Sequence, residues 1–119
     1  MRDHPVAHAI AERLSAARLA FLSATDFVIA RAKFDVNAVF AGSVPYLLLA
    51  GNLVAGWQLA RSMLVAERKL AAGEDIAFMR RKIDAARFYA EHVLTRVPGL
   101  RDTIVDGAAA VNDVALEDL

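Results

Sequence analysis

Residues 36–60 contain no charged side chain, and this neutral segment constrains the fold of the chain more than any other feature. The segment reads VNAVFAGSVPYLLLAGNLVAGWQLA, and the charged run of residues 61–69 follows it directly. So much apolar surface is unfavourable in water. It must therefore be covered by lipid, by the other helices of a bundle, or by a partner, and each choice makes a different protein.

The neutral segment is long enough to cross a membrane, since about 20 apolar residues suffice. However, a proline, three glycines and four polar side chains interrupt it: Pro45, Gly42, Gly51, Gly56, Asn37, Ser43, Asn52 and Gln58. Basic residues flank both ends, Lys33 before and Arg61 after, so the charge asymmetry that orients membrane helices is missing. We therefore expect no membrane span, and a membrane hairpin is kept only as an alternative.

The chain of 119 residues is long enough for one domain, so we expect residues 1–119 to fold as a single unit. Hydrophobic residues make up 57% of it, and the mean hydropathy of +0.37 suggests buried surface beyond the chain's own core.

The 14 basic residues balance the 14 acidic ones, which argues against nucleic-acid binding. The absence of cysteine excludes disulfides and thiolate metal sites. The charged N-terminal segment lacks a signal-peptide core, so we expect a cytoplasmic protein.

Helical spacing dominates the pattern of apolar residues, and no stretch alternates for long enough to predict a strand. The first helix is predicted over residues 5–33, with Pro5 in its first turn, where a missing N–H costs nothing. Its apolar stripe recurs at steps of four and three, at Ile10, Leu14, Ala17, Phe21, Ala24 and Val28.

A second helix is predicted over residues 36–72, with Asp35 as its N-cap and Gly73 as its C-terminal cap. Pro45 lies inside this helix and should kink it, or break it after Ser43. The alternative to one long helix is a short helix before Pro45 and a longer one after it.

Residues 76–104 follow a strict heptad, which is typical of a helix packed in a bundle. Its apolar positions are Ile76, Met79, Ile83, Ala86, Ala90, Val93, Val97, Leu100 and Ile104. The register survives Pro98 and Gly99, so the chain either continues as a kinked helix or restarts in phase near Pro98. Short links near residues 32–35, 72–75 and 98–99 favour an all-α, antiparallel up-and-down four-helix bundle. One of its helices, over residues 36–72, is long and is either straight or kinked at Pro45.

Few residues have the spacing of a catalytic or metal site. His4 and His8 lie four apart, but no third ligand accompanies them, so we expect no metal. The Glu-x-x-His motif of di-iron bundles, the phosphate loop, the dinucleotide fingerprint and the nucleophile elbow are all absent. Arg80, Arg81 and Lys82 form a small basic cluster, which is either a solvated face or a phosphate-contact patch.

Two blocks of the sequence resemble a known family. They are VPYLLLAGNLVAGWQLARS at residues 44–62 and KIDAARFYAEHVL at residues 82–94. In order and spacing they are similar to the extra C-terminal helical domain of the longer acyl-CoA dehydrogenases. The matching positions are Pro45, Tyr46, Gly51, Gly56, Trp57, Ala60 and Arg61 in the first block, and Lys82, Ile83, Ala86, Arg87, Phe88, Tyr89, Ala90, Glu91, His92 and Leu94 in the second. The run RFYAEH is the more specific signal, because helix amphipathicity does not require it.

The resemblance implies that the catalytic parts lie elsewhere. In such enzymes preceding domains hold the flavin and the acyl-CoA thioester, and the catalytic glutamate also lies upstream. We therefore expect no catalytic, cofactor-binding or metal-binding residue in this chain, which would not be an enzyme on its own; FAD would belong to the parent enzyme.

The resemblance further implies a helical domain, or a separate subunit, that packs on a dehydrogenase body or in a homo-oligomer. The candidate interface and packing residues are Tyr46, Gly51, Asn52, Gly56, Trp57, Gln58, Arg61, Arg87, Phe88, Tyr89, Glu91 and His92. Whether the chain is a fragment or an independent protein stays open. The alternative function is a small binding module that holds an acyl chain or acyl-CoA between its helices.

Overall fold

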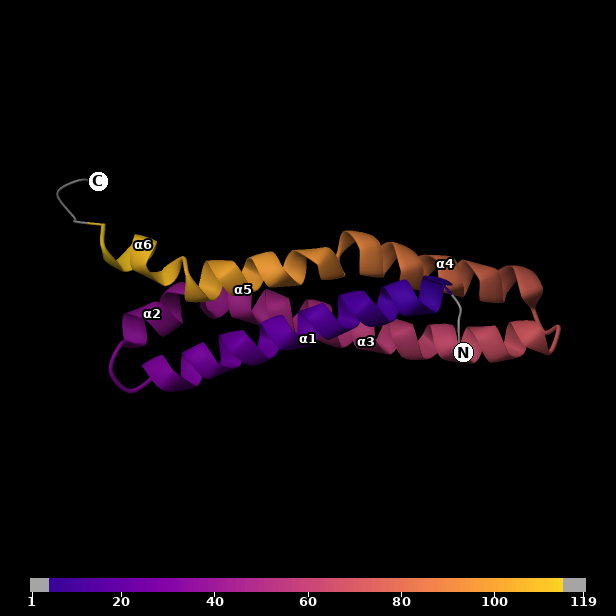
Figure 1. Ribbon diagram of the computed structural model, residues 1–119, viewed down its shortest axis with the longest axis horizontal. Coiled ribbons are helices and arrows are strands. Elements are labelled where there is room, and N and C mark those ends of the chain that lie inside the picture. The colour runs from indigo at the N-terminus through magenta and orange to yellow at the C-terminus, as the bar shows by residue number, and fades with distance from the viewer. Residues whose placement is uncertain (1–4, 115–119) are drawn as a thin grey trace.

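The computed structural model describes residues 5–114, and every regular element in that range is helical, as predicted (Figure 1). The elements in chain order are α1 (Pro5–Arg31), α2 (Val36–Ala41), α3 (Ser43–Ala71), α4 (Ile76–His92), the 3-10 turn η1 (Leu94–Arg96), α5 (Val97–Val105) and α6 (Ala108–Asn112). The long helices pack side by side into an elongated all-α bundle with extents of 65 × 27 × 18 Å.

The N-terminal part follows the prediction closely. α1 begins at Pro5 and ends at Arg31, two residues before the expected end. The predicted N-cap is confirmed, because the Asp35 carboxylate accepts a hydrogen bond from the backbone N–H of Ala38 at 3.4 Å. The same carboxylate pairs with the Arg31 guanidinium at 3.4 Å, so the turn between α1 and α2 is held from both sides.

The predicted long helix is divided, and the alternative of a short helix followed by a longer one is confirmed. The break lies at Gly42, however, one residue before the expected position after Ser43. The reason is that the ring of Pro45 would clash with the carbonyl of Ala41, four residues earlier, in a continuous helix. α2 therefore ends at Ala41. Pro45 then lies in the first turn of α3, where a backbone N–H would have no partner within the helix.

α3 ends in the predicted glycine cap. Gly73 has a φ of +77°, and its N–H donates to the Leu70 carbonyl at 3.0 Å, while the Glu74 N–H donates to the Lys69 carbonyl at 2.9 Å. These two bonds form a Schellman motif, which satisfies carbonyls that the helix end would leave free. The chain then reverses into α4 through Asp75, whose φ of 42° is also left-handed.

The heptad of residues 76–104 restarts in phase after an interruption, as one of the two predictions had it. α4 ends at His92, η1 adds one tight turn, and α5 begins at Val97 with Pro98 at its second position. α5 continues in the direction of α4, so residues 98–99 do not reverse the chain as the up-and-down scheme expected (Figure 1). Turning α5 back would withdraw Val97 and Ile104, which are now almost fully buried, from the core.

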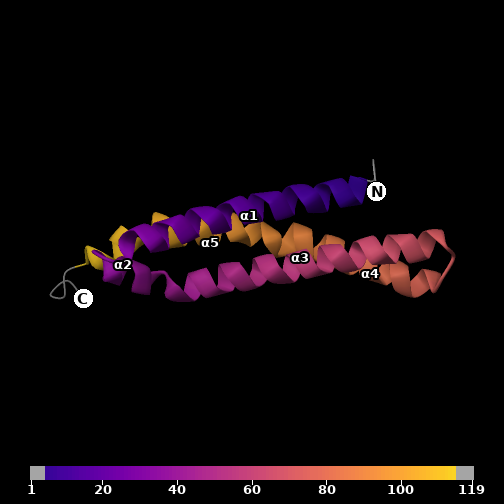
Figure 2. The ribbon, with the colours of Figure 1, turned by 90° about the horizontal axis from the view of Figure 1, so that it is seen from below.

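The core is narrow because its residues are small. α1 and α3 run antiparallel, and α4 and α5 lie behind the groove between them (Figure 2). Eight of the buried positions are alanine: Ala17, Ala20, Ala24, Ala38, Ala66, Ala86, Ala90 and Ala108. The larger side chains that are fully buried are Leu49, Leu94, Val97 and Ile104. Two heptad details differ from expectation, since Ile76 is 46% exposed and Leu94, rather than its neighbour Val93, is fully buried.

Candidate docking surface

α3 carries residues 43–60 of the neutral segment, which is most of it, and has two apolar faces, of which the bundle covers one. Leu49, Gly56 and Met63 recur every seven residues on the buried side. The opposite side, here called the outer face of α3, consists of Val44, Leu47, Leu48, Gly51, Val54 and Ala55, and all six are exposed. Val44 and Leu47 each keep 74% of their accessible surface. The neutral segment is thus only half shielded by its own chain.

The two candidate glycines of α3 lie in opposite environments. A Cβ at Gly56 would lie 2.7 Å from Cδ2 of Leu94, so this glycine makes room for a buried leucine. A Cβ at Gly51 would meet no atom within 4 Å. The packing of this chain therefore explains Gly56, but it gives no reason for a glycine at position 51.

Trp57 lies at the edge of a groove between α1 and α3 and is 49% exposed. Two adjoining hollows of about 430 and 500 Å³ share Trp57, Ala11 and Leu14 in their walls. The Arg61 guanidinium lies 5.1 Å from the centroid of the indole ring, close enough for a cation–π contact. Gln58 is exposed on the other side of α3, toward α4.

Three of the candidates hold the bundle together. The Tyr46 hydroxyl is 2.8 Å from the Thr25 hydroxyl, and its ring stacks on Phe21 with centroids 5.8 Å apart. The Tyr89 hydroxyl donates a hydrogen bond to the backbone carbonyl of Asn52 at 2.9 Å, which ties α4 to α3. Partial burial raises the pKa of the Tyr89 phenol above its ordinary value.

The remaining candidates lie together on the exposed side of α4. Arg87 and Glu91 form an ion pair of 3.3 Å one helical turn apart. The ring of Phe88, which is 62% exposed, stacks on His92 with centroids 4.4 Å apart. These contacts are local to one helix and contribute little to stability at an exposed site.

A tie between α1 and α5 was not predicted. The Arg101 Nε donates to the Ser23 hydroxyl at 3.0 Å, and the same guanidinium pairs with Asp102 at 2.9 Å and Asp106 at 3.3 Å. The two helices are far apart in the sequence, so no local spacing could have indicated this contact. Leu94 was also missed as a core residue, because the heptad pointed to its neighbour.

The polar and charged side chains of the described residues lie at or near the surface. No polar or charged side chain between residues 5 and 114 is buried, although catalytic acids and bases usually owe their altered pKa values to burial or to charged neighbours. His8 pairs with Glu12 at 3.3 Å, and His4 lies outside the described residues. Within residues 5–114 no group of three potential ligands could hold a metal. No helix in the same range has the length and apolarity that a membrane crossing requires.

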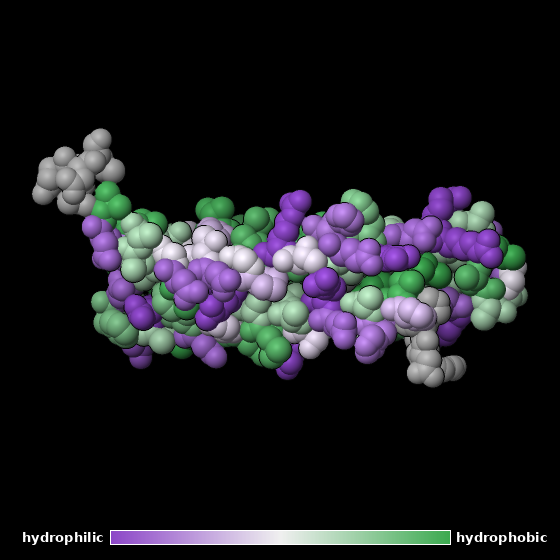
Figure 3. Space-filling view, turned by 45° about the horizontal axis from the view of Figure 1, so that its top comes forward, coloured by the Kyte–Doolittle hydropathy of each residue, from purple (hydrophilic) through white to green (hydrophobic). Residues whose placement is uncertain are grey.

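The surface therefore alternates between charged and apolar areas. On the face seen in Figure 3, green apolar side chains lie between the purple hydrophilic ones. The hydrophilic residues therefore do not form a continuous shell over this face. Together with the outer face of α3, this exposed apolar surface is what the chain offers to another molecule.

Comparisons with known proteins show which sequences the chain is similar to. The family model described as "Acetyl-CoA dehydrogenase C-terminal like" matches residues 2–115. The chain is 45% identical over 100 residues to the 3-methylmercaptopropionyl-CoA dehydrogenase of Ruegeria pomeroyi. The matched region covers 84% of this chain and 17% of that protein. It is 33% identical over 86 residues to the broad-specificity linear acyl-CoA dehydrogenase FadE5 of Mycobacterium tuberculosis, covering 67% of this chain and 14% of that protein. The chain thus spans less than a fifth of these curated relatives, and no solved structure matches it.

Proposed function

The chain belongs to the acyl-CoA dehydrogenase C-terminal domain family, and from this premise we propose that it is a non-catalytic domain that docks on the body of such an enzyme. The contact surface in this proposal is the outer face of α3. The observation that carries the proposal is that Val44, Leu47, Leu48 and Val54 are all more than half exposed in the bundle. Covering one such side chain is worth about 1.5–3 kcal/mol.

Gly51 supports a close contact at this surface. A glycine within a helix costs roughly 0.5–1 kcal/mol relative to alanine. No neighbour among residues 5–114 occupies the space over Gly51, which lies between Leu47, Leu48, Val54 and Ala55 on α3. A partner whose backbone approaches α3 at this point would give the glycine a purpose.

The length of the relatives supports a dehydrogenase body as the occupant of this surface. The chain matches 17% of one relative and 14% of another, so most of each relative lies outside the matched region. In the proposal, that remainder holds the flavin, the thioester and the catalytic base, and this domain supplies packing surface.

A chimeric enzyme tests the docking. The Ruegeria pomeroyi relative would have its matching segment replaced by this chain, and the variant would carry L47D and L48D. We expect the unmodified chimera to unfold in one cooperative transition and the variant to unfold in two, because buried carboxylates would detach the domain. V111D, at a residue 61% exposed on α6, is the matched control. Equal behaviour of L47D/L48D and V111D would overturn the proposal.

A separate measurement tests the proposal that the chain is not catalytic. The purified chain should carry no flavin absorbance and should not reduce an artificial electron acceptor when given acyl-CoA. Flavin retained by the isolated chain would contradict it. Self-association through the outer face of α3, lost in L47D/L48D, would identify a second copy as the occupant in place of the body.

The groove beside Trp57 favours a second candidate function, the binding of an acyl chain between α1 and α3. Its walls are mostly apolar, and it is of the size usual for small-molecule sites. Trp57 is the only tryptophan of the chain, so its fluorescence reports on the groove directly. A saturable change on titration with a fatty acid, absent in Leu14→Gln, would support this function; an unchanged spectrum would remove it.

A further inference from the structure

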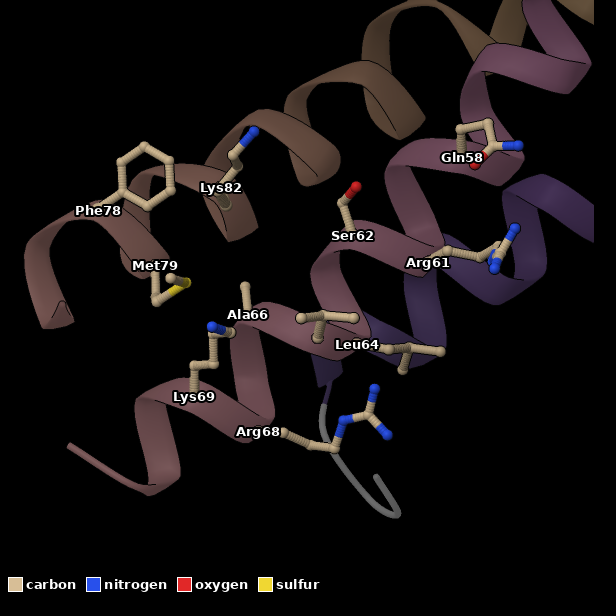
Figure 4. Close-up of a pocket in the computed structure, with 11 residues that line it drawn as sticks. Gln58, Arg61, Ser62, Leu64, Ala66, Arg68, Lys69, Phe78, Met79 and Lys82 are labelled. Carbon is tan, nitrogen blue, oxygen red and sulfur yellow. The ribbon is translucent and has the colours of Figure 1, made fainter. Parts of the chain in front are cut away.

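A second groove, between α3 and α4, has a different character. It has a volume of about 530 Å³, and its floor includes the buried residues Ala66 and Met79 (Figure 4). It lies at the end of the molecule where the α3–α4 hairpin extends beyond the start of α1 (Figure 2). Four basic side chains line it, and none of the described residues in its wall is acidic.

The hairpin that carries this groove is rich in basic residues, and four of them line the groove: Arg61, Arg68, Lys69 and Lys82. Six of the 14 lie between residues 61 and 82, and they are Arg61, Arg68, Lys69, Arg80, Arg81 and Lys82. None of the six forms an ion pair within residues 5–114, whereas Arg31, Arg87 and Arg101 all do. Glu67, on the same helix, lines a neighbouring hollow with Leu64, Arg68 and Ala71, so Arg68 borders both hollows. The positive charge at the groove is therefore not compensated by an acid in its wall.

The side chains converge from both helices. Lys69 of α3 and Lys82 of α4 project over the floor, and the Ser62 hydroxyl points into the space between the helices (Figure 4). Phe78 closes one side and is 47% exposed, with the Lys82 ammonium 5.5 Å from its ring centroid. Arg61 and Arg68 lie at the other edge and point away from α4 (Figure 4).

We propose that this groove binds the phosphorylated nucleotide end of coenzyme A, with Lys69 and Lys82 on the phosphates and Ser62 as an additional hydrogen-bond donor. Lysines act as point charges toward phosphate, and an exposed phenyl ring offers a stacking surface for a base. The inference rests on the proposed function, because membership in a dehydrogenase family is what makes a CoA thioester the phosphorylated ligand at hand. Ser62 and Val65 line this groove, and along α3 they continue the outer face toward the hairpin.

Calorimetry on the 119-residue chain tests this inference directly. Coenzyme A would be compared with adenosine, which lacks phosphates, and with pyrophosphate, which lacks the base. We expect coenzyme A to bind at least about tenfold more tightly than adenosine, and its affinity to fall as salt rises from 50 to 300 mM. Pyrophosphate binding as well as coenzyme A would show that the groove is a phosphate site without nucleotide recognition, and would overturn the nucleotide part.

Charge-reversed variants locate the site. K69E/K82E should weaken coenzyme A binding by more than about tenfold. R13E/R96E is the matched control, because it changes the net charge equally at two exposed arginines outside the groove. All four side chains are exposed, so the folds should match by circular dichroism. Equal losses in the two variants would mean non-specific attraction and would overturn the proposal, as would binding of an acidic peptide with equal affinity.

The outcome is separable from that of the docking experiment. Coenzyme A binding is measured on the chain alone, while docking is measured on the chimera with substitutions on the outer face of α3. A chain that binds coenzyme A but does not dock, or that docks but does not bind, would therefore be recognised as such.

Discussion

At the residue scale, Gly51 and Gly56 separate internal packing from an uncovered surface within one helix. They are five residues apart and alike in sequence context, yet only Gly56 touches a buried side chain. The cost of glycine in a helix is common to both, so substitutions at the two positions measure what surrounds each of them.

Gly51→Ala should stabilise the isolated chain by up to about 1 kcal/mol, because it removes backbone freedom from the unfolded state and meets no atom. Gly56→Val should destabilise it by about 1–3 kcal/mol, because the new side chain would overlap that of Leu94, which is 1% exposed. Urea unfolding of both variants gives these free energies. Equal shifts in the two variants would contradict the packing described for α3.

Tyr89→Phe should make stability less sensitive to alkali. Burial raises the pKa of the phenol above 10.0, so the folded chain keeps the proton more tightly than the unfolded chain does. Stability that depends on this proton is complete below pH 10 and is lost as the pH rises through the folded pKa. Urea midpoints from pH 8 to 11.5 should therefore fall more steeply in the wild type than in Tyr89→Phe. Parallel curves would show that the Tyr89 hydroxyl is as well solvated as in the unfolded chain.

At the element scale, the helix ends follow local chemistry, while the choice of buried face does not. Asp35, Pro45 and Gly73 each fix a helix boundary through their own backbone or side-chain geometry, and these boundaries could be predicted from the sequence to within two residues. The break at Gly42 required the additional step of counting four residues back from the proline ring.

The inward face of α3 could not be predicted in the same way. Leu47 and Leu49 are equally apolar, and a segment that is apolar on all sides gives no periodic signal. Leu49 is buried and Leu47 is 74% exposed only because α1, α4 and α5 lie where they do. For the same reason the interface candidates could be named from the sequence, but not divided into those that face inward, such as Tyr46, and those that face solvent, such as Phe88.

Leu94→Ala should test the interruption between α4 and α5. Leu94 lies in η1, is fully buried and fills the space over Gly56. Its truncation should cost about 2–5 kcal/mol of unfolding free energy. Leu47→Ala makes the same chemical change on the outer face of α3 and should stay within about 0.5 kcal/mol in the isolated chain. Thermal or urea unfolding compares the pair, and a small effect at both positions would mean that η1 is not part of the core.

At the scale of the whole molecule, the chain exposes more surface than its mass requires. Its accessible surface is 7808 Å², against about 6300 Å² for a compact monomer of this mass, and its radius of gyration is 18.4 Å, against about 13–14 Å. The excess surface of about 1500 Å² exceeds the roughly 800 Å² that one partner contributes to a standard protein–protein interface.

A hydrophobic dye should report this exposed surface. We expect the isolated chain to enhance the fluorescence of anilinonaphthalene sulfonate, and L47D/L48D to reduce that enhancement by at least about half, because these leucines lie near the centre of the outer face of α3. V111D should change it little. Small-angle scattering of the dilute chain should give a radius of gyration of about 18 Å if it stays a monomer.

The overhang of the α3–α4 hairpin has a consequence for local stability. Among the described residues, each helix of the hairpin has only one neighbour beyond the start of α1, so fewer contacts oppose its opening than in the middle of the rod. Amide hydrogens near Lys69 and Phe78 should accordingly exchange with solvent sooner than those near Leu49 or Ala90. An anion bound between the two helices would slow that exchange. Deuterium uptake at the tip of the hairpin would then measure how much of the groove is occupied, even if the structure does not change.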